Sequence, residues 1–287
     1  MTLAGVISLA LTVSLFVLVF VLGMKAKLEE ITFLFRNPGL LIRSILAMNV
    51  IMLAVVVLAS QLFDLAPAIK IALVTLAVSP VPPLLPGKQI ASGGTPHYAL
   101  GLLVAASIVS IVLVPLSIET MEYAFPVELR IAPSKVLSVV ALSIFAPLAL
   151  GMIVQWLAPN IAERVAKPLS SAATAIVVVA IIPILIKGWP DLSNLFGNGA
   201  VLCLVLFSAS GLLIGHLIGG PNADDRTVLA LACGSRHPSI ALAITALNFP
   251  GVPGVAALIL YHLVISGLVS ALYLRWIKPP TQSPSAN

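Results

Sequence analysis

Charged side chains are scarce in this sequence: Asp, Glu, Lys and Arg together occupy 9% of its 287 positions. A soluble domain usually carries about 25% of such residues, so a chain this poor in charge cannot cover a surface that faces water. Cysteine is almost absent as well, and Cys203 and Cys233 lie in apolar segments, where we expect packing residues rather than a disulfide. No residues have the spacing of metal ligands, and we expect neither a metal nor a cofactor.

Apolar residues are what the sequence has instead. They make up 60% of the chain, and its mean hydropathy is +1.15. Apolar runs of roughly 20 residues recur along the whole length, and each can cross a hydrocarbon core about 30 Å thick. Because the runs are continuous rather than alternating, they predict helices and not the strands of a barrel. The sequence therefore predicts an all-α polytopic membrane protein.

Nine membrane segments are predicted, in a single transmembrane domain over 1–278 that is followed by a polar tail at 279–287. The segments are roughly 3–23, 40–61, 67–94, 97–118, 134–157, 167–187, 198–218, 225–248 and 252–276.

Most of the basic residues fall in the short loops between these segments, nine on one side and four on the other. Without a basic patch interleaved with aromatic residues, the net charge of +5 does not indicate nucleic-acid binding. The side richer in Lys and Arg is predicted to be cytoplasmic, which places the N-terminus outside and the C-terminus inside. The compact, loop-poor chain favours a bacterial inner (plasma) membrane.

Two segments carry prolines near their middle, and each is predicted to break there. Segment 67–94 contains Pro82, Pro83 and Pro86, and segment 225–248 contains Gly234 and Pro238. Proline removes a helix donor and clashes with the preceding turn, although an ordinary kink is the alternative.

The two broken segments also open similarly, with IKIALVTLAVSP in one and DRTVLALACGSR in the other. They lie five segments apart, and an odd offset means that the second enters the membrane from the opposite side. Interrupted segments at matching positions of an inverted repeat indicate a transporter with its binding site near the bilayer midplane.

Lys88 and Arg236 are the two basic residues outside the loops, and they fall at the two predicted breaks. The ten acidic residues all fall in loops or at segment ends. A charge at bilayer depth costs about 3 kcal/mol. Two cationic side chains without a carboxylate partner therefore predict an anionic substrate. Arg236 could hold a carboxylate through two hydrogen bonds, with Lys88 as a point charge. The alternatives are that either side chain bonds to carbonyls freed by the breaks, or that Lys88 extends to the interface.

The residues predicted to bind the substrate surround the two breaks. They are Gly87, Lys88, Gln89, Ser235, Arg236, His237 and Ser239. We expect His237 to form a hydrogen bond at the helix break, and the alternative is that it carries a proton.

At these residues the sequence resembles the bile acid:sodium symporter family. The resemblance runs from the NPGLLIRS stretch to the last segment, and its most specific pieces are the proline-rich break and GSRHPSIALAI. It implies ten helices in two inverted repeats, with a core domain built on two crossing interrupted helices and a separate panel domain. By this comparison the chain lacks the first helix.

The resemblance also implies sodium ligands that this chain has lost. Sodium-coupled members bind two ions through Ser, Asn, Thr, Gln and Glu side chains. The corresponding positions here are Met48, Gly87, Lys88, Gly101, Ala105, Ala232 and Arg236. Hard cations need oxygen ligands, so Lys88 and Arg236 are expected to stand where the two ions would sit. Lysine can lose its proton when desolvated, which makes protons an alternative coupling ion.

The sequence thus predicts a secondary transporter that moves a small organic anion, a carboxylate, by alternating access without sodium. A sodium-coupled symporter is the first alternative, and an anion channel or a membrane sensor is the alternative of another class. An intramembrane enzyme is not expected, because paired buried acids and metal clusters are missing from the sequence. Substrate and oligomeric state stay open.

Overall fold

The computed structural model describes residues 3–121, 131–196 and 199–277, and every regular element within them is helical. Seven helices of this part are long and apolar enough to cross a membrane, or up to eight if the bent pair α1 and α2 is one span. The predicted all-α polytopic membrane protein is confirmed, whereas the count of nine and the inverted repeat stay predictions. The predicted polar tail lies outside the described residues.

The elements follow in chain order, with η marking π-helical turns. They are α1 (Leu3–Lys25), α2 (Leu28–Arg36), α3 (Pro38–Ile45), η1 (Leu46–Ile51), α4 (Met52–Leu62), α5 (Pro67–Val78), α6 (Leu85–Ala91), α7 (Pro96–Met121), α8 (Pro133–Val140), η2 (Ala141–Phe145), α9 (Ala146–Leu157), α10 (Pro159–Phe196), α11 (Ala200–Ile218), α12 (Ala223–Gly234), α13 (Pro238–Asn248) and α14 (Val255–Ile277).

Proline marks where many of these helices begin. Its fixed φ suits the first helical position, where the missing N–H has no helical partner to lose. The helices α3, α5, α7, α8, α10 and α13 each start at a proline. The same residue type that interrupts the two central segments therefore also marks the start of six α-helices.

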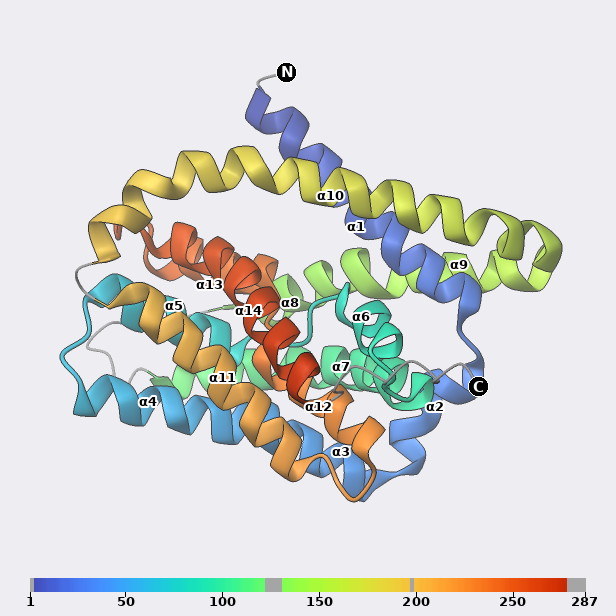
Figure 1. The fold of residues 1–287 in the computed structure, drawn as a ribbon, viewed down its shortest axis with the longest axis horizontal. Coiled ribbons are helices and arrows are strands. Elements are labelled where there is room, and N and C mark those ends of the chain that lie inside the picture. Colours follow the sequence, from blue (N-terminus) through green and yellow to red (C-terminus); the bar gives the residue numbers. More distant parts are fainter. Residues whose placement is uncertain (1–2, 122–130, 197–198, 278–287) are drawn as a thin grey trace, which may run out of the picture.

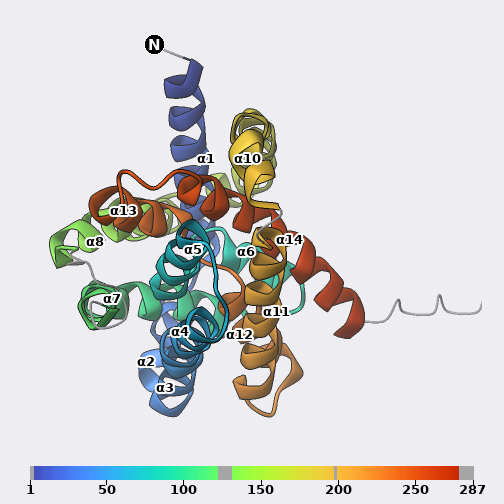
Figure 2. The same ribbon diagram turned by 90° about the vertical axis from the view of Figure 1, so that its left-hand side faces the viewer.

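The helices α5 and α12 form the centres of two apolar clusters. Every residue of α5 from Ile71 to Val78 is buried, and so is every residue of α12 from Thr227 to Gly234. One cluster surrounds α5 with α4, α8, α11, α13 and α14, and the other surrounds α12 with α3, α6 and the first half of α7. In Figure 2, α5 and α12 lie well inside the molecule, away from α1 and α10.

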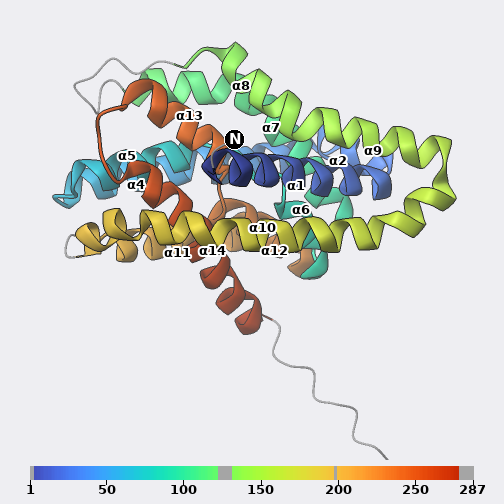
Figure 3. The same cartoon turned by 90° about the horizontal axis from the view of Figure 1, so that it is seen from above.

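The helices α1, α9 and α10 form a separate layer at one edge (Figure 1). A tight turn at Ala158 joins α9 to α10, and α1 packs between them (Figure 3). The approach of α1 to α9 is close, because a Cβ at Gly23 would meet the Leu148 carbonyl and one at Gly151 the Phe20 carbonyl. The long helix α10 spans 38 residues and extends the predicted segment 167–187 at both ends.

The short helix α2 is absent from the predicted segments. It turns by 88° from α1 and packs across the first half of α7. Leu34 is fully buried there, while Leu28 and Phe35 on the same helix are exposed. The sequence prediction missed α2 because a nine-residue helix with two glutamates is too short and too polar to resemble a membrane span.

Candidate functional site

The two interrupted segments meet at their nonhelical residues. Helix α5 ends at Val78 and α6 begins at Leu85, and α12 ends at Gly234 and α13 begins at Pro238. The backbone N–H of His237 donates to the carbonyl oxygen of Pro80 at 2.9 Å. Inside a bilayer, backbone groups that are not hydrogen-bonded within a helix must find partners elsewhere in the protein. Here one nonhelical stretch supplies the donor and the other supplies the acceptor. These stretches coincide with the breaks predicted from sequence.

Arg236 lies next to this contact between the breaks and is 1% exposed. Its Nη2 donates to the carbonyl oxygen of Met48 at 2.7 Å, and its Nη1 makes a longer contact of 3.4 Å with the carbonyl oxygen of Ser79. Ser79 is the first residue beyond α5, and Met48 lies in the π-helical turn η1. The Ser79 contact corresponds to the alternative in which the guanidinium bonds to a carbonyl at a break, whereas the Met48 contact reaches a carbonyl outside the breaks.

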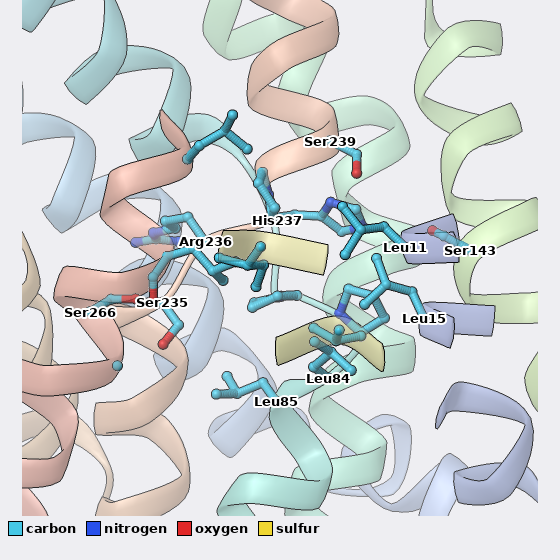
Figure 4. A pocket seen from close by; sticks show the side chains of 18 of the residues that line it. Leu11, Leu15, Leu84, Leu85, Ser143, Ser235, Arg236, His237, Ser239 and Ser266 are labelled. Carbon is cyan, nitrogen blue, oxygen red and sulfur yellow. Dashed lines mark hydrogen bonds between the residues drawn. The ribbon is translucent and has the colours of Figure 1, made fainter. Parts of the chain in front are cut away.

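A cavity of about 890 Å³ opens beside the two breaks, where they meet α1 and α10. Its walls come from α1, η2 and α10 on one side and from the two breaks, α13 and α14 on the other. In Figure 4, His237 lies between Arg236 and the α1 residue Leu11, and Arg236 is directed away from Leu11. The volume is in the range of pockets that hold small molecules.

The walls are mostly apolar, with a few polar groups. Lys88 is half-buried in the lining and forms no hydrogen bond or ion pair within the described ranges. Both ring nitrogens of His237, which is 2% exposed, also have no partner among the described residues. No carboxylate lines the cavity as far as the structure describes its side chains. The site thus combines positive charge, an imidazole and an apolar wall.

The cavity brings together most of the residues predicted to bind the substrate. Those that line it are Lys88, Ser235, Arg236, His237 and Ser239, with Pro82, Pro83 and Pro238. Gly87, Gln89, Pro86 and Gly234 are not among the lining residues. Gly87 is exposed, and Gln89 is fully buried with its Nε2 donating to the carbonyl oxygen of Val228 at 2.7 Å. Gln89 therefore ties α6 to α12.

The positions that the resemblance assigns to sodium ligands lie in different surroundings. Met48 and Arg236 are in direct contact, and Ala105 and Ala232 are fully buried. At Gly101, a Cβ would lie 3.1 Å from the carbonyl oxygen of Glu30 and 3.3 Å from the backbone nitrogen of Leu34. A side chain at 101 would thus point at α2.

Several lining residues escaped the sequence analysis. Thr12 of α1, Ser143 of η2 and Ser266 of α14 contribute hydroxyl groups from helices distant from the breaks. Single hydroxyl residues are ordinary in membrane helices, and no pattern in the sequence separates these three from the others. Only the packing of α1, η2 and α14 around the cavity reveals them.

Comparison with known families fits this architecture. A profile of the sodium bile acid symporter family matches residues 12–189, more than half of the chain. The chain belongs to this family. The predicted resemblance is confirmed, and at the level of the family it indicates a secondary transporter of bile acids or related organic anions, since members of this family are transporters rather than enzymes. The match covers Lys88 but ends within α10, so Arg236 and His237 lie outside the matched residues. No curated protein matches the chain.

Proposed function

We propose that this family member carries a small carboxylate across the membrane by alternating access and does not need sodium to do so. The observation that carries the proposal is the cavity of about 890 Å³ beside the two breaks, with the unpartnered ammonium of Lys88 in its lining. Apolar side chains such as Leu11 and Leu15 of α1 line the same cavity. Such a site suits an organic anion with an apolar body.

In this proposal Lys88 binds the carboxylate. Its ammonium has no other partner among the residues that the structure describes, and a charge at this depth needs one. The neutral imidazole of His237 can donate one hydrogen bond and accept another, so it would hold a second polar group of the substrate. Ser235 and Ser239 add hydroxyl groups to the lining beside the breaks.

Arg236 has a different role in the proposal. Its hydrogen bonds to the Met48 carbonyl in η1 and to the Ser79 carbonyl at the first break are contacts of the kind that a bound cation would make with backbone oxygens. Arginine stays charged at any physiological pH. A permanent cation held there would take the place of a sodium ion that sodium-coupled members bind. This supports sodium-independent transport.

Ligand-induced thermal stabilisation of the purified protein tests the proposal. Three carboxylates, pyruvate, pantoate and cholate, would each be added in sodium and in potassium buffer. We expect one of them to raise the melting temperature equally in both buffers, because a ligand that binds only the folded state stabilises it. In Lys88→Gln, at least about ten times more ligand should be needed for the same rise in melting temperature. Lys70→Gln, near the start of α5, should respond like wild type. A shift that needs sodium would instead favour an ordinary sodium symporter.

A further inference from the structure

Exposed basic residues gather at the end of the molecule where α1 finishes, away from the cavity. In Figure 1, α2 and the turn from α9 to α10 both lie at this end. Three candidate spans, Pro38–Leu62, Pro133–Leu157 and Pro159–Pro183, start or finish here, so this surface lies where the helices reach the membrane boundary. The exposed basic residues of this surface are Lys25, Lys27, Arg36, Arg43, Arg164 and Lys167.

The packing of the helices brings these residues together. Met24 of α1 is buried in one cluster with Ala162 and Ala166 of α10, so the cations at the start of α10 lie beside the end of α1. Helix α2 follows α1 after a linker of only Ala26 and Lys27, and a single residue separates α2 from α3. The six cations therefore form one surface over α1, α2, α3 and α10.

Few acids offset this positive charge. The six cations form no ion pair among the residues that the structure describes. On α2 and the start of α10, the exposed acids are Glu29 and Glu163. At the start of α12, Asp225 accepts hydrogen bonds from the Thr95 hydroxyl and the Asn222 amide. The surface therefore has an excess of positive charge that attracts anions.

Apolar side chains are exposed among the cations. Leu28 and Phe35 lie seven residues apart on one face of α2 and are 66% and 46% exposed. Lys27 precedes this pair and Arg36 follows it, which is the pattern of a helix that lies in the membrane interface. Trp156, next to the last residue of α9, is 81% exposed, and tryptophan at the end of a span is typical of the headgroup level.

We infer that this surface, made of the six cations with Leu28 and Phe35, binds anionic phospholipids. The lipid phosphate would pair with the Lys and Arg side chains, and the acyl chains would contact the apolar pair. An acidic soluble protein would match the charge but not the apolar side chains at the headgroup level. Each cation close to anionic headgroups should strengthen binding about fivefold at low ionic strength. The inference does not depend on the proposed transport function.

Thermal stability of the full chain in detergent tests the inference. Dioleoylphosphatidylglycerol, which is anionic, and dioleoylphosphatidylcholine, which is zwitterionic, would be titrated separately. We expect the anionic lipid to raise the melting temperature at a concentration at least about tenfold lower than the zwitterionic lipid needs. Salt at roughly 0.5 M should weaken this response, because it screens exposed charges. Equal responses to the two lipids would overturn the inference.

Two matched double variants locate the binding surface. Lys27→Gln with Arg36→Gln should need at least about ten times more phosphatidylglycerol for the same rise in melting temperature. Lys70→Gln with Lys135→Gln, at the starts of α5 and α8, removes the same charge and should respond like wild type. If both double variants lose the response equally, net charge alone explains it and the inference is wrong.

A soluble acidic polymer tests the alternative occupant. Polyglutamate, added at the same concentration of negative charge, should stabilise the protein far less than phosphatidylglycerol does. Equal stabilisation would assign the surface to an acidic protein segment and overturn the inference. If Lys27→Gln with Arg36→Gln does not fold, the wild-type comparison of the two lipids and polyglutamate still decides.

Discussion

The Nη2 of Arg236 donates to the carbonyl oxygen of Met48 at 2.7 Å, which joins two positions where the family resemblance places sodium ligands. The contact links the break after α12 to the π-helical turn η1. A π-turn displaces a helical carbonyl from its usual hydrogen bond, and here that carbonyl accepts from a side chain 188 residues away. A covalently attached cation thus connects elements that ion-binding relatives are expected to connect through sodium.

Restoring the oxygen ligands should restore a response to sodium. In the triple variant Met48→Gln, Ala232→Glu, Arg236→Gln, we expect sodium to raise the melting temperature relative to potassium. At a sodium concentration 100 times its Kd, the stabilisation should be about 2.7 kcal/mol. Thermal unfolding in detergent measures it, with wild type and Arg236→Gln as controls without response. If all three proteins behave alike in the two buffers, the assignment of these positions is wrong.

Serine at Gly101 should destabilise the protein, while serine at Gly87 should not. A Cβ at 101 would lie 3.1 Å from the Glu30 carbonyl oxygen, so α2 has to shift, whereas a Cβ at 87 meets nothing within 4 Å. We expect Gly101→Ser to cost about 1 kcal/mol or more and Gly87→Ser to stay within about 0.5 kcal/mol of wild type. Melting temperatures of the two variants, measured side by side, check this. Equal stability would contradict the packing of α2 on α7.

Alanine at Gly151 should loosen the contact between α1 and α9. Its Cβ would collide with the carbonyl of Phe20, a backbone atom that cannot rotate away. We expect a loss of about 1–3 kcal/mol of unfolding free energy, seen as a lower melting temperature. Gly39→Ala is the matched control, because a Cβ at 39 has open space around it.

Methionine at Gln89 should lower stability without changing anion binding. The side chain is fully buried, donates to the Val228 carbonyl oxygen and does not line the cavity. Loss of this hydrogen bond should cost about 1 kcal/mol. Melting curves with and without the stabilising anion separate the two effects, and Gln61→Met on the exposed side of α4 serves as the control. If the anion raises the melting temperature of Gln89→Met less than that of wild type, Gln89 contributes to anion binding after all.

The sequence alone singled out the two charged residues of the candidate site because charge is so rare in this chain. Lys88 and Arg236 are conspicuous among apolar residues, and the prolines beside them predict nonhelical backbone. It did not reveal that Arg236 bonds to Met48, because carbonyl availability depends on a π-turn that leaves no compositional trace. Nor did it reveal the wall formed by α1 and α10, since only tertiary packing brings Thr12 and Pro183 to the breaks.

Helix α2 imposes a limit on how far α1 can travel. It is docked on α7 through Gly101, and only Ala26 and Lys27 lie between it and the end of α1 at Lys25. Three peptide steps span at most about 11 Å. If the layer of α1, α9 and α10 slides against the breaks, the linker at 26–27 acts as a short tether. The length of this linker therefore limits how far the end of α1 can move relative to α2.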